Sequence, residues 1–221
     1  GAAYSITAPV TAWAGANAHT GIDTNANALT IDNLSPASAT VTSGSLGYLA
    51  NSLNWTSSSS SDFNTTGGAV VYRWGATSAG SEVPAEGSSP AAGATNGTAT
   101  VACLVSSGIS QMVSVVDGSG GSGGCLTTAL TAGQNYTYKV FQRDLYGNYD
   151  AGVLIGTFRP YGAVSAATST VVASPTSVAA DNYTAATITV TLKDSAGTAV
   201  PGKAVALAAG SGSSVITTLS G

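Results

Sequence analysis

The chain has 221 residues, a net charge of −4 at pH 7, and only 7% Asp, Glu, Lys and Arg. Its six basic residues are scattered and form no continuous positive stripe, which argues against a nucleic-acid partner. Every apolar run is far shorter than the roughly 20 residues that cross a bilayer as a helix, so we expect no membrane insertion.

The polar character comes from Ser, Thr, Asn and Gly rather than from charged residues. The hydrophobic fraction of 43% is ordinary, so the composition is that of a folded chain. A surface with few charges can pack closely against copies of itself, because little charge has to be desolvated. The same composition also suits a secreted domain with a Ser/Thr-rich coat, and both interpretations stay open here.

The first predicted element is a strand at residues 4–12 that alternates apolar and polar side chains. Its apolar side chains are those of Tyr4, Ile6, Ala8 and Val10. No partner for this strand is evident in the neighbouring sequence, and Pro9 would fit only at the edge of a sheet or at a position that makes no hydrogen bond. Residues 1–30 are therefore interpreted as an extension that carries a candidate assembly strand.

Short runs rich in Val, Thr and Tyr follow, and glycines separate them at intervals of about ten residues, which is typical of strands rather than helices. These strand-like runs cover residues 52–56, 69–74, 99–105, 111–116, 136–143 and 153–158. Their spacing predicts an all-β, antiparallel sandwich.

Cys103 and Cys125 lie on either side of a glycine-rich loop at residues 117–124. In a chain of secreted character we expect a disulfide, which would stabilise the fold by about 3 kcal/mol in the chain-entropy model. The glycines are interpreted as a flexible tether that lets the cysteines meet. Two thiols and His19 do not complete a four-ligand zinc site, and no Gly-Lys-Ser/Thr follows to bind phosphate.

No group of residues carries a catalytic pattern, so we expect no catalytic residue, cofactor or metal site. Glu82 and Glu86 lie in a Gly/Pro/Ser-rich loop and are interpreted as solvated, and His19 as a surface residue. The segment 144–150 has carboxylate and amide oxygens that could hold calcium. Its ordinary interpretation is a turn in which Gly147 and Asn148 adopt left-handed geometry.

Trp13 and Trp74 could stack on sugar rings, although each could equally cover the edge of a core. Asn-X-Ser/Thr sequons are frequent because Ser and Thr are abundant, and glycosylation remains open. They occur at Asn33, Asn54, Asn64, Asn96, Asn135 and Asn182.

Leu53-Asn54-Trp55 suits a second strand with a core tryptophan, residues 68–73 suit a third strand, and residues 130–148 suit the region around a sixth. Through these stretches, residues 31–160 resemble a fibronectin type III domain of bacterial secreted proteins. This resemblance implies a tyrosine corner at Tyr136, and Tyr136, Tyr138 and Val140 would share one face of a strand. The module is longer than the family's usual size because of an insertion between Gly75 and Gly124, where a binding function could be placed.

An Ala/Ser/Thr-rich linker at 161–169 is followed by four characteristic stretches, at 173–178, 186–192, 193–197 and 200–207. Through these stretches, residues 170–221 resemble the first half of a bacterial Ig-like repeat of invasin and intimin type. Ile188, Val190 and Leu192 alternate with threonines, which predicts one buried and one solvated face. Asp194 to Gly197 predicts the hairpin turn, and Pro201-Gly202 the next break.

Half a sandwich leaves an open core, for which we consider three explanations. The chain could continue beyond residue 221, or the half could be short or disordered. Alternatively, a strand from another copy could complete it, with residues 4–12 as the donor.

The expected architecture is two antiparallel Ig-like or fibronectin III-like sandwiches in tandem, the second incomplete. The expected function is a non-enzymatic, secreted structural protein, a stalk or filament subunit at a bacterial cell surface. Its expected partners are other copies or further Ig-like domains. The alternative is a carbohydrate-binding or adhesin module of a secreted protein.

Overall fold

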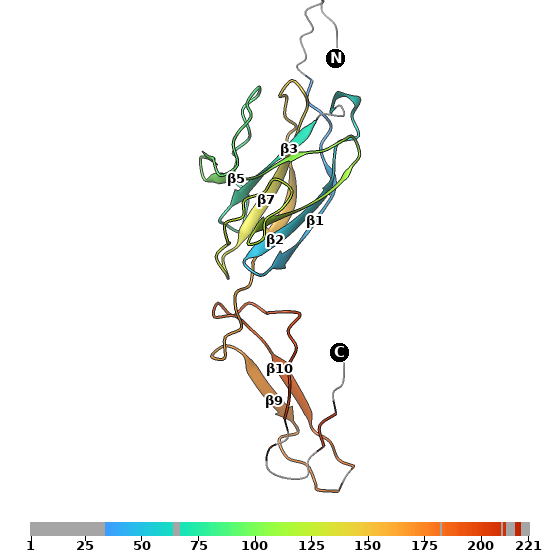
Figure 1. The fold of residues 1–221 in the computed structure, drawn as a ribbon, viewed down its shortest axis with the longest axis vertical. Coiled ribbons are helices and arrows are strands. Elements are labelled where there is room, and N and C mark those ends of the chain that lie inside the picture. The colour runs from blue at the N-terminus through green and yellow to red at the C-terminus, as the bar shows by residue number, and fades with distance from the viewer. Residues whose placement is uncertain (1–33, 64–66, 182, 209, 211–214, 218–221) are drawn as a thin grey trace, which may run out of the picture.

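The structure is a computed structural model that describes residues 34–63, 67–181, 183–208, 210 and 215–217 (Figure 1). The strands pair antiparallel, and the described residues contain no α-helix, only a 3-10 turn at Ser61–Phe63. The all-β prediction is confirmed. The strands are β1 (Thr40–Gly47), β2 (Ala50–Thr56), β3 (Gly68–Trp74), β4 (Thr95–Asn96), β5 (Ala99–Ser106), β6 (Met112–Gly118), β7 (Tyr136–Arg143), β8 (Val153–Phe158), β9 (Thr170–Ser174) and β10 (Thr187–Thr191).

The apolar runs of the sequence correspond closely to strands, and the predicted runs at 136–143 and 153–158 coincide with β7 and β8. No sequence signal predicts β1, because its residues are small and mostly polar. β1 is a strand because it pairs with β2 and lies against β8, where Gly44 leaves room for the ring of Phe158. The predicted strand at 4–12 lies outside the described residues.

Two sheets form a sandwich, one in the order β1-β2-β6 and the other in the order β4-β5-β3-β7-β8. Their facing sides enclose the main core, to which alternate residues of each strand contribute. In the three-stranded sheet Leu53 lies opposite Val115 and Trp55 opposite Val113, so the predicted core tryptophan is buried. Across the core lie Ala69 and Val71 of β3, Tyr138 and Val140 of β7, and Ile155 of β8.

A second apolar cluster lies on the outer side of the five-stranded sheet. It contains Val70, Tyr72 and Trp74 of β3, Ala99 and Val101 of β5, and Phe141 and Tyr149. The segment between β3 and β5 lies over this side: Ala79 packs on the cluster, and Thr137 Oγ1 donates to Ala76 O at 2.8 Å. This half of the insertion therefore buries the outer side of the sheet, which explains why β3 is apolar on both sides.

β9 and β10 form a separate two-stranded hairpin beyond one end of the sandwich (Figure 1). Val190 lies opposite Val171 and Ile188 opposite Ala173, so these four side chains make the apolar face of the hairpin. The prediction that Ile188, Val190 and Leu192 are buried is wrong, because Ile188 is 45% exposed and the other two are only half-buried. The alternation of apolar and polar residues determines which side chains share one face of the hairpin. That face is buried only if a second sheet packs on it, and the described residues supply no such sheet.

The predicted turn at Asp194–Gly197 is confirmed. Gly197 N donates to Asp194 O at 2.9 Å, and Gly197 has a φ of +78°, which glycine adopts without strain. Beyond the turn, Ala199 bridges to Lys193, and no further named strand follows in the described residues.

Candidate functional site

The two cysteines form the predicted disulfide, Cys103–Cys125. Cys103 lies in β5, and the loop that carries Cys125 begins at the end of β6 in the opposite sheet, so the bond links the two sheets through this loop. Leu104 N donates to Gly124 O and Leu126 N to Ala102 O, at 3.0 and 2.9 Å, and both bonds hold the loop along β5. Such a bond is typical of oxidising compartments.

The glycines of this loop serve close packing rather than the flexible tether that we expected. Gly123 and Gly124 have φ values of +66° and +83°. A Cβ at Gly124 would come within 1.9 Å of Leu104 O, and a Cβ at Gly123 within 2.4 Å of a methyl carbon of Val115. Only glycine allows this backbone to approach both sheets so closely.

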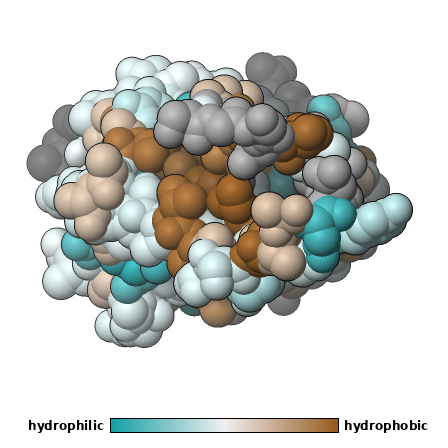
Figure 2. Space-filling model, turned by 90° about the horizontal axis from the view of Figure 1, so that it is seen from below, coloured by the Kyte–Doolittle hydropathy of each residue, from teal (hydrophilic) through white to brown (hydrophobic). Residues whose placement is uncertain are grey.

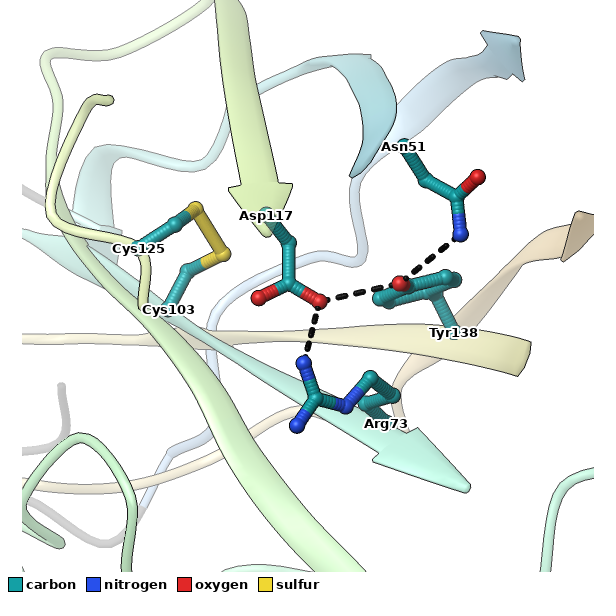
Figure 3. Close-up of a disulfide and its surroundings, with 6 residues drawn as sticks. All are labelled: Asn51, Arg73, Cys103, Asp117, Cys125 and Tyr138. Atoms are coloured by element: carbon teal, nitrogen blue, oxygen red, sulfur yellow. Dashed lines mark hydrogen bonds and ion pairs between the residues drawn. A yellow bond between two sulfur atoms is a disulfide. The ribbon is translucent and has the colours of Figure 1, made fainter. Parts of the chain in front are cut away.

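Four polar side chains meet in the interior of the sandwich, close to the disulfide (Figure 3). Asp117 Oδ2 accepts hydrogen bonds from Arg73 Nη1 at 2.7 Å and from the hydroxyl of Tyr138 at 2.9 Å. Asn51 Nδ2 in turn donates to the Tyr138 oxygen at 3.1 Å. We call these four residues the polar cluster.

The register of the strands explains why these residues meet. Asn51 of β2 lies opposite Asp117 of β6, and Arg73 of β3 lies opposite Tyr138 of β7. Each sheet thus presents one cross-strand polar pair to the other, and the hydrogen bonds join the pairs across the sandwich. In the sequence, the signal of the polar cluster is a charged residue in an otherwise apolar strand, Arg73 in β3 and Asp117 near the end of β6. Our predictions missed the cluster.

The polar cluster is a structural rather than a reactive site, since three of its members are fully buried. Burial raises the pKa of Asp117, against the opposing effect of the Arg73 guanidinium. Burial and the neighbouring carboxylate also raise the pKa of Tyr138. Asp117 Oδ1 and Asn51 Oδ1 accept no hydrogen bond within the described residues. The polar cluster therefore joins the two sheets, but the desolvation of these two oxygens costs part of the free energy that its hydrogen bonds contribute.

The tyrosine corner is confirmed. The hydroxyl oxygen of Tyr136 accepts a hydrogen bond from Thr131 N at 3.0 Å, which fixes the turn into β7. The guanidinium of Arg73 lies 5.5 Å from the centre of the Tyr136 ring, so this corner also contacts the polar cluster.

Glu86 is exposed and Glu82 is partly exposed, which agrees with the solvated interpretation, but both residues also hold the insertion in place. Glu82 accepts hydrogen bonds from Thr98 N, Thr98 Oγ1 and Trp74 Nε1, at 2.7, 2.6 and 2.9 Å. The bonds from Thr98 and Trp74 lower the pKa of Glu82 to about 2. Glu86 accepts from Tyr149 N at 2.9 Å. Composition alone did not reveal these roles, since the partners are distant in sequence or belong to another strand.

Of the two candidate sugar-stacking tryptophans, Trp74 is buried in the outer cluster, with its indole N–H bound to Glu82. A buried ring cannot stack on a carbohydrate. Trp13 and His19 lie outside the described residues, as do the sequons at Asn33, Asn64 and Asn182. At the sequon of Asn96, the side-chain amide donates to Val83 O at 2.8 Å.

The segment 144–150 is a turn, as its ordinary interpretation predicts, but of the two residues expected to be left-handed only Gly147 is, and Asn148 is not. Asp144 Oδ1 accepts from Tyr146 N and Asn148 N, at 2.8 and 2.9 Å, and Gly147 has a φ of +91°. Asp150 Oδ1 accepts from Gln142 N at 2.8 Å. Both carboxylates are thus engaged with the backbone, and the described residues contain no group of three His, Cys, Asp or Glu side chains that could hold a metal ion.

The joint between the sandwich and the hairpin is held by hydrogen bonds on both sides. On the sandwich side, Tyr161 N donates to Gly47 O at 3.0 Å and Leu49 N donates to Tyr161 O at 2.9 Å. The rings of Tyr48 and Tyr161 lie in contact, with 6.2 Å between their centres. The residue that follows the sandwich is therefore bonded to the turn between β1 and β2.

On the hairpin side, the joint is organised by Asp194, which is fully buried. Its carboxylate accepts hydrogen bonds from Gly162 N, Ala196 N and Thr198 N, at 2.8, 3.0 and 2.8 Å. Burial tends to raise the pKa of Asp194, but these N–H donors outweigh it and lower the pKa. Arg159 Nη2 completes the joint by donating to Ala196 O at 2.9 Å.

No helix in the described part of the chain is long and apolar enough to cross a membrane. Comparisons with protein-family models, with curated proteins and with solved structures each gave no match, so the assignment of function rests on the residues themselves.

Proposed function

We propose that this chain is a non-catalytic extracellular structural protein, an Ig-like stalk or filament subunit at a bacterial cell surface. The observation that carries the proposal is the joint between sandwich and hairpin. A short linker without such bonds would let the two parts rotate freely, whereas backbone bonds at Tyr161 and side-chain bonds at Asp194 fix their orientation. A fixed orientation is what a stalk requires.

The strand arrangement supports a fibronectin type III-like assignment for the sandwich. With the two-residue β4 set aside, Trp55 lies on the second strand, residues 68–73 on the third and Tyr136 on the sixth, as the resemblance implies. The two linked sheets and the tyrosine corner support the same assignment. Because this fold serves many functions, the joint and the hairpin carry the functional argument.

The surface composition supports the extracellular structural assignment. With 7% charged residues, most of the surface is neutral, and two such surfaces can meet with little desolvation of charge. The disulfide fits an oxidising compartment outside the cytoplasm. The carbohydrate-binding alternative is weakened, because Trp74, one of its two candidate tryptophans, is buried in the apolar cluster on the outer side of the five-stranded sheet.

Two assays on the purified, oxidised chain separate these functions. A filament subunit assembles without ligand, which negative-stain electron microscopy and light scattering over a range of concentrations detect. A stalk segment stays monomeric and rigid in small-angle X-ray scattering. A monomer that is retarded in a gel containing polysaccharide would support the carbohydrate-binding alternative and contradict our proposal.

The contribution of the joint is tested with Asp194→Ala. We expect loss of the bonds to Gly162, Ala196 and Thr198 to broaden the distance distribution in small-angle scattering. Asp181→Ala is the matched control, because it removes the same charge from an exposed turn where the carboxylate accepts local hydrogen bonds from Tyr183 and Thr184. Equal scattering from both variants and the wild type would show that the joint does not set the orientation.

A further inference from the structure

The hairpin of β9 and β10 is an incomplete sheet. On its apolar face, Val171 is 69% exposed and Ile188 is 45% exposed. Figure 2, which views the molecule from the end where the hairpin lies, shows apolar side chains gathered on that end. A hairpin of two strands is marginally stable, and a third strand is the usual minimum for an apolar face to be held in place.

The outer edge of β9 is unprotected. Natural edge strands commonly carry charges, proline or a bulge that prevent another strand from pairing. β9 contains only Thr, Val, Ala and Ser, and its register with β10 shows no bulge. Within the described residues, no strand pairs with this edge. On the other side of the hairpin, Ala199 and Val200 bond to the residues that follow β10, so β9 has the more open edge.

The segment Tyr4–Val10 has the sequence properties that this edge requires. Its apolar side chains alternate with small polar ones, and residues 1–22 contain no Asp, Glu, Lys or Arg. In an extended strand the N–H groups of alternate residues point to the same side. The N–H groups of Tyr4, Ile6, Ala8 and Val10 therefore point to one side, and Pro9, which has no N–H, faces the other.

Pro9 is compatible with pairing for this reason. If the side shared by Ile6 and Val10 bonds to β9, Pro9 lies on the new outer edge, where a missing N–H costs nothing. There it would also prevent a further strand from adding. The apolar side chains would then continue the apolar face of the hairpin.

We propose that the segment Tyr4–Val10 of one copy adds as a strand to the free edge of β9 in the next copy. The described chain begins at Leu34, and β1 starts at the end of the sandwich far from the hairpin, because its last residue, Gly47, lies at the joint (Figure 1). The described chain thus enters the sandwich at the end opposite to the one that bears the acceptor edge. Head-to-tail contacts of this kind generate open filaments unless the rotation between successive copies closes them into a ring. This inference rests on the proposed filament function and identifies the contact between neighbouring subunits.

The test uses two variants of the full chain. The donor variant carries Ile6→Asp and Val10→Asp and keeps an intact hairpin. The acceptor variant carries Val171→Asp and Ile188→Asp and keeps an intact donor segment. We expect each variant alone to remain monomeric under conditions in which the wild type assembles. An equimolar mixture should form a heterodimer and stop there, because only one productive contact remains.

The matched control for the donor variant carries Ser5→Asp and Thr7→Asp, which add the same charge to the opposite face of the segment. This control should assemble like the wild type. Near-ultraviolet circular dichroism of Trp55 and Trp74 verifies that the sandwich of every variant is folded. Size-exclusion chromatography with light scattering measures the assembly state.

Assembly of either variant alone, or a mixture that stays monomeric, would overturn the inference. If the wild type and both variants all assemble, the filament function stands and its contact lies elsewhere. A wild type that is monomeric at every concentration overturns the strand addition, and the scattering experiment on Asp194→Ala then decides between a rigid stalk and no structural role.

Discussion

Arg73 and Asp117 form an ion pair, with 2.7 Å between Nη1 and Oδ2, that connects β3 of one sheet to β6 of the other. Asp117 is fully buried, while Arg73 retains a small exposed fraction. Buried charges lose their hydration, so a pair of this kind stabilises a fold only while both partners are present. The pair makes the sandwich more sensitive to loss of one partner than to loss of both.

Arg73→Met should lower the free energy of unfolding by about 3 kcal/mol, because Asp117 then remains buried without its cation. The double variant Arg73→Met/Asp117→Leu should recover a large part of this loss, since no charge stays unpaired. Urea unfolding followed by tryptophan fluorescence measures both. A double variant that is no more stable than the single one would contradict this account of the polar cluster.

We expect the free energy of unfolding to depend on pH through the ionisation of Glu82. Its pKa in the folded chain is about 2, below the ordinary value of 4.5, so the folded state binds fewer protons than the unfolded state between these values. The stabilisation by Glu82 is complete above pH 4.5 and is lost as the pH falls towards 2. The difference in free energy of unfolding between the wild type and Glu82→Gln should shrink over this range. A difference that is constant with pH would show that the carboxylate does not act through its charge.

Gly124 and Gly120 offer a matched pair, because both have positive φ, +83° and +73°. A Cβ at Gly124 would lie 1.9 Å from Leu104 O, whereas a Cβ at Gly120 meets nothing within 4 Å. Gly124→Ala should therefore destabilise the chain well beyond the roughly 1 kcal/mol expected for Gly120→Ala from backbone strain alone. Thermal unfolding of the oxidised proteins compares them. Equal melting temperatures would show that the loop moves away at little cost.

Removal of the disulfide with Cys103→Ala/Cys125→Ala should cost about 3 kcal/mol in the free energy of unfolding, because the unfolded chain is no longer constrained. Reduction of the wild type should give a similar loss. Chemical denaturation with and without reductant measures both effects. If only the alanine variant is destabilised, the loss comes from packing around Cys103, which is buried in the core, and not from the bond.

The local features of this protein follow from its sequence. Alternating or continuous apolar runs locate β2, β3, β5, β6, β7, β8 and β10, because side-chain period and strand propensity are local properties. The same holds for the turn at Asp194–Gly197 and for the tyrosine corner at Tyr136, whose partner lies within the same turn. The disulfide is expected from residue type and compartment, and the structure contains it.

Only the tertiary structure decides which faces are covered and which charges are paired. Arg73 meets Asp117 because the registers of two different sheets align them, and no local pattern records that alignment. Glu82 and Trp74 bind each other because the insertion folds over the sheet. Ile188 is exposed although its alternation predicts burial, because burial depends on a second layer that the described chain does not place there. The sequence by itself thus determines the strands and turns, while long-range packing determines the two cores, the polar cluster and the open hairpin.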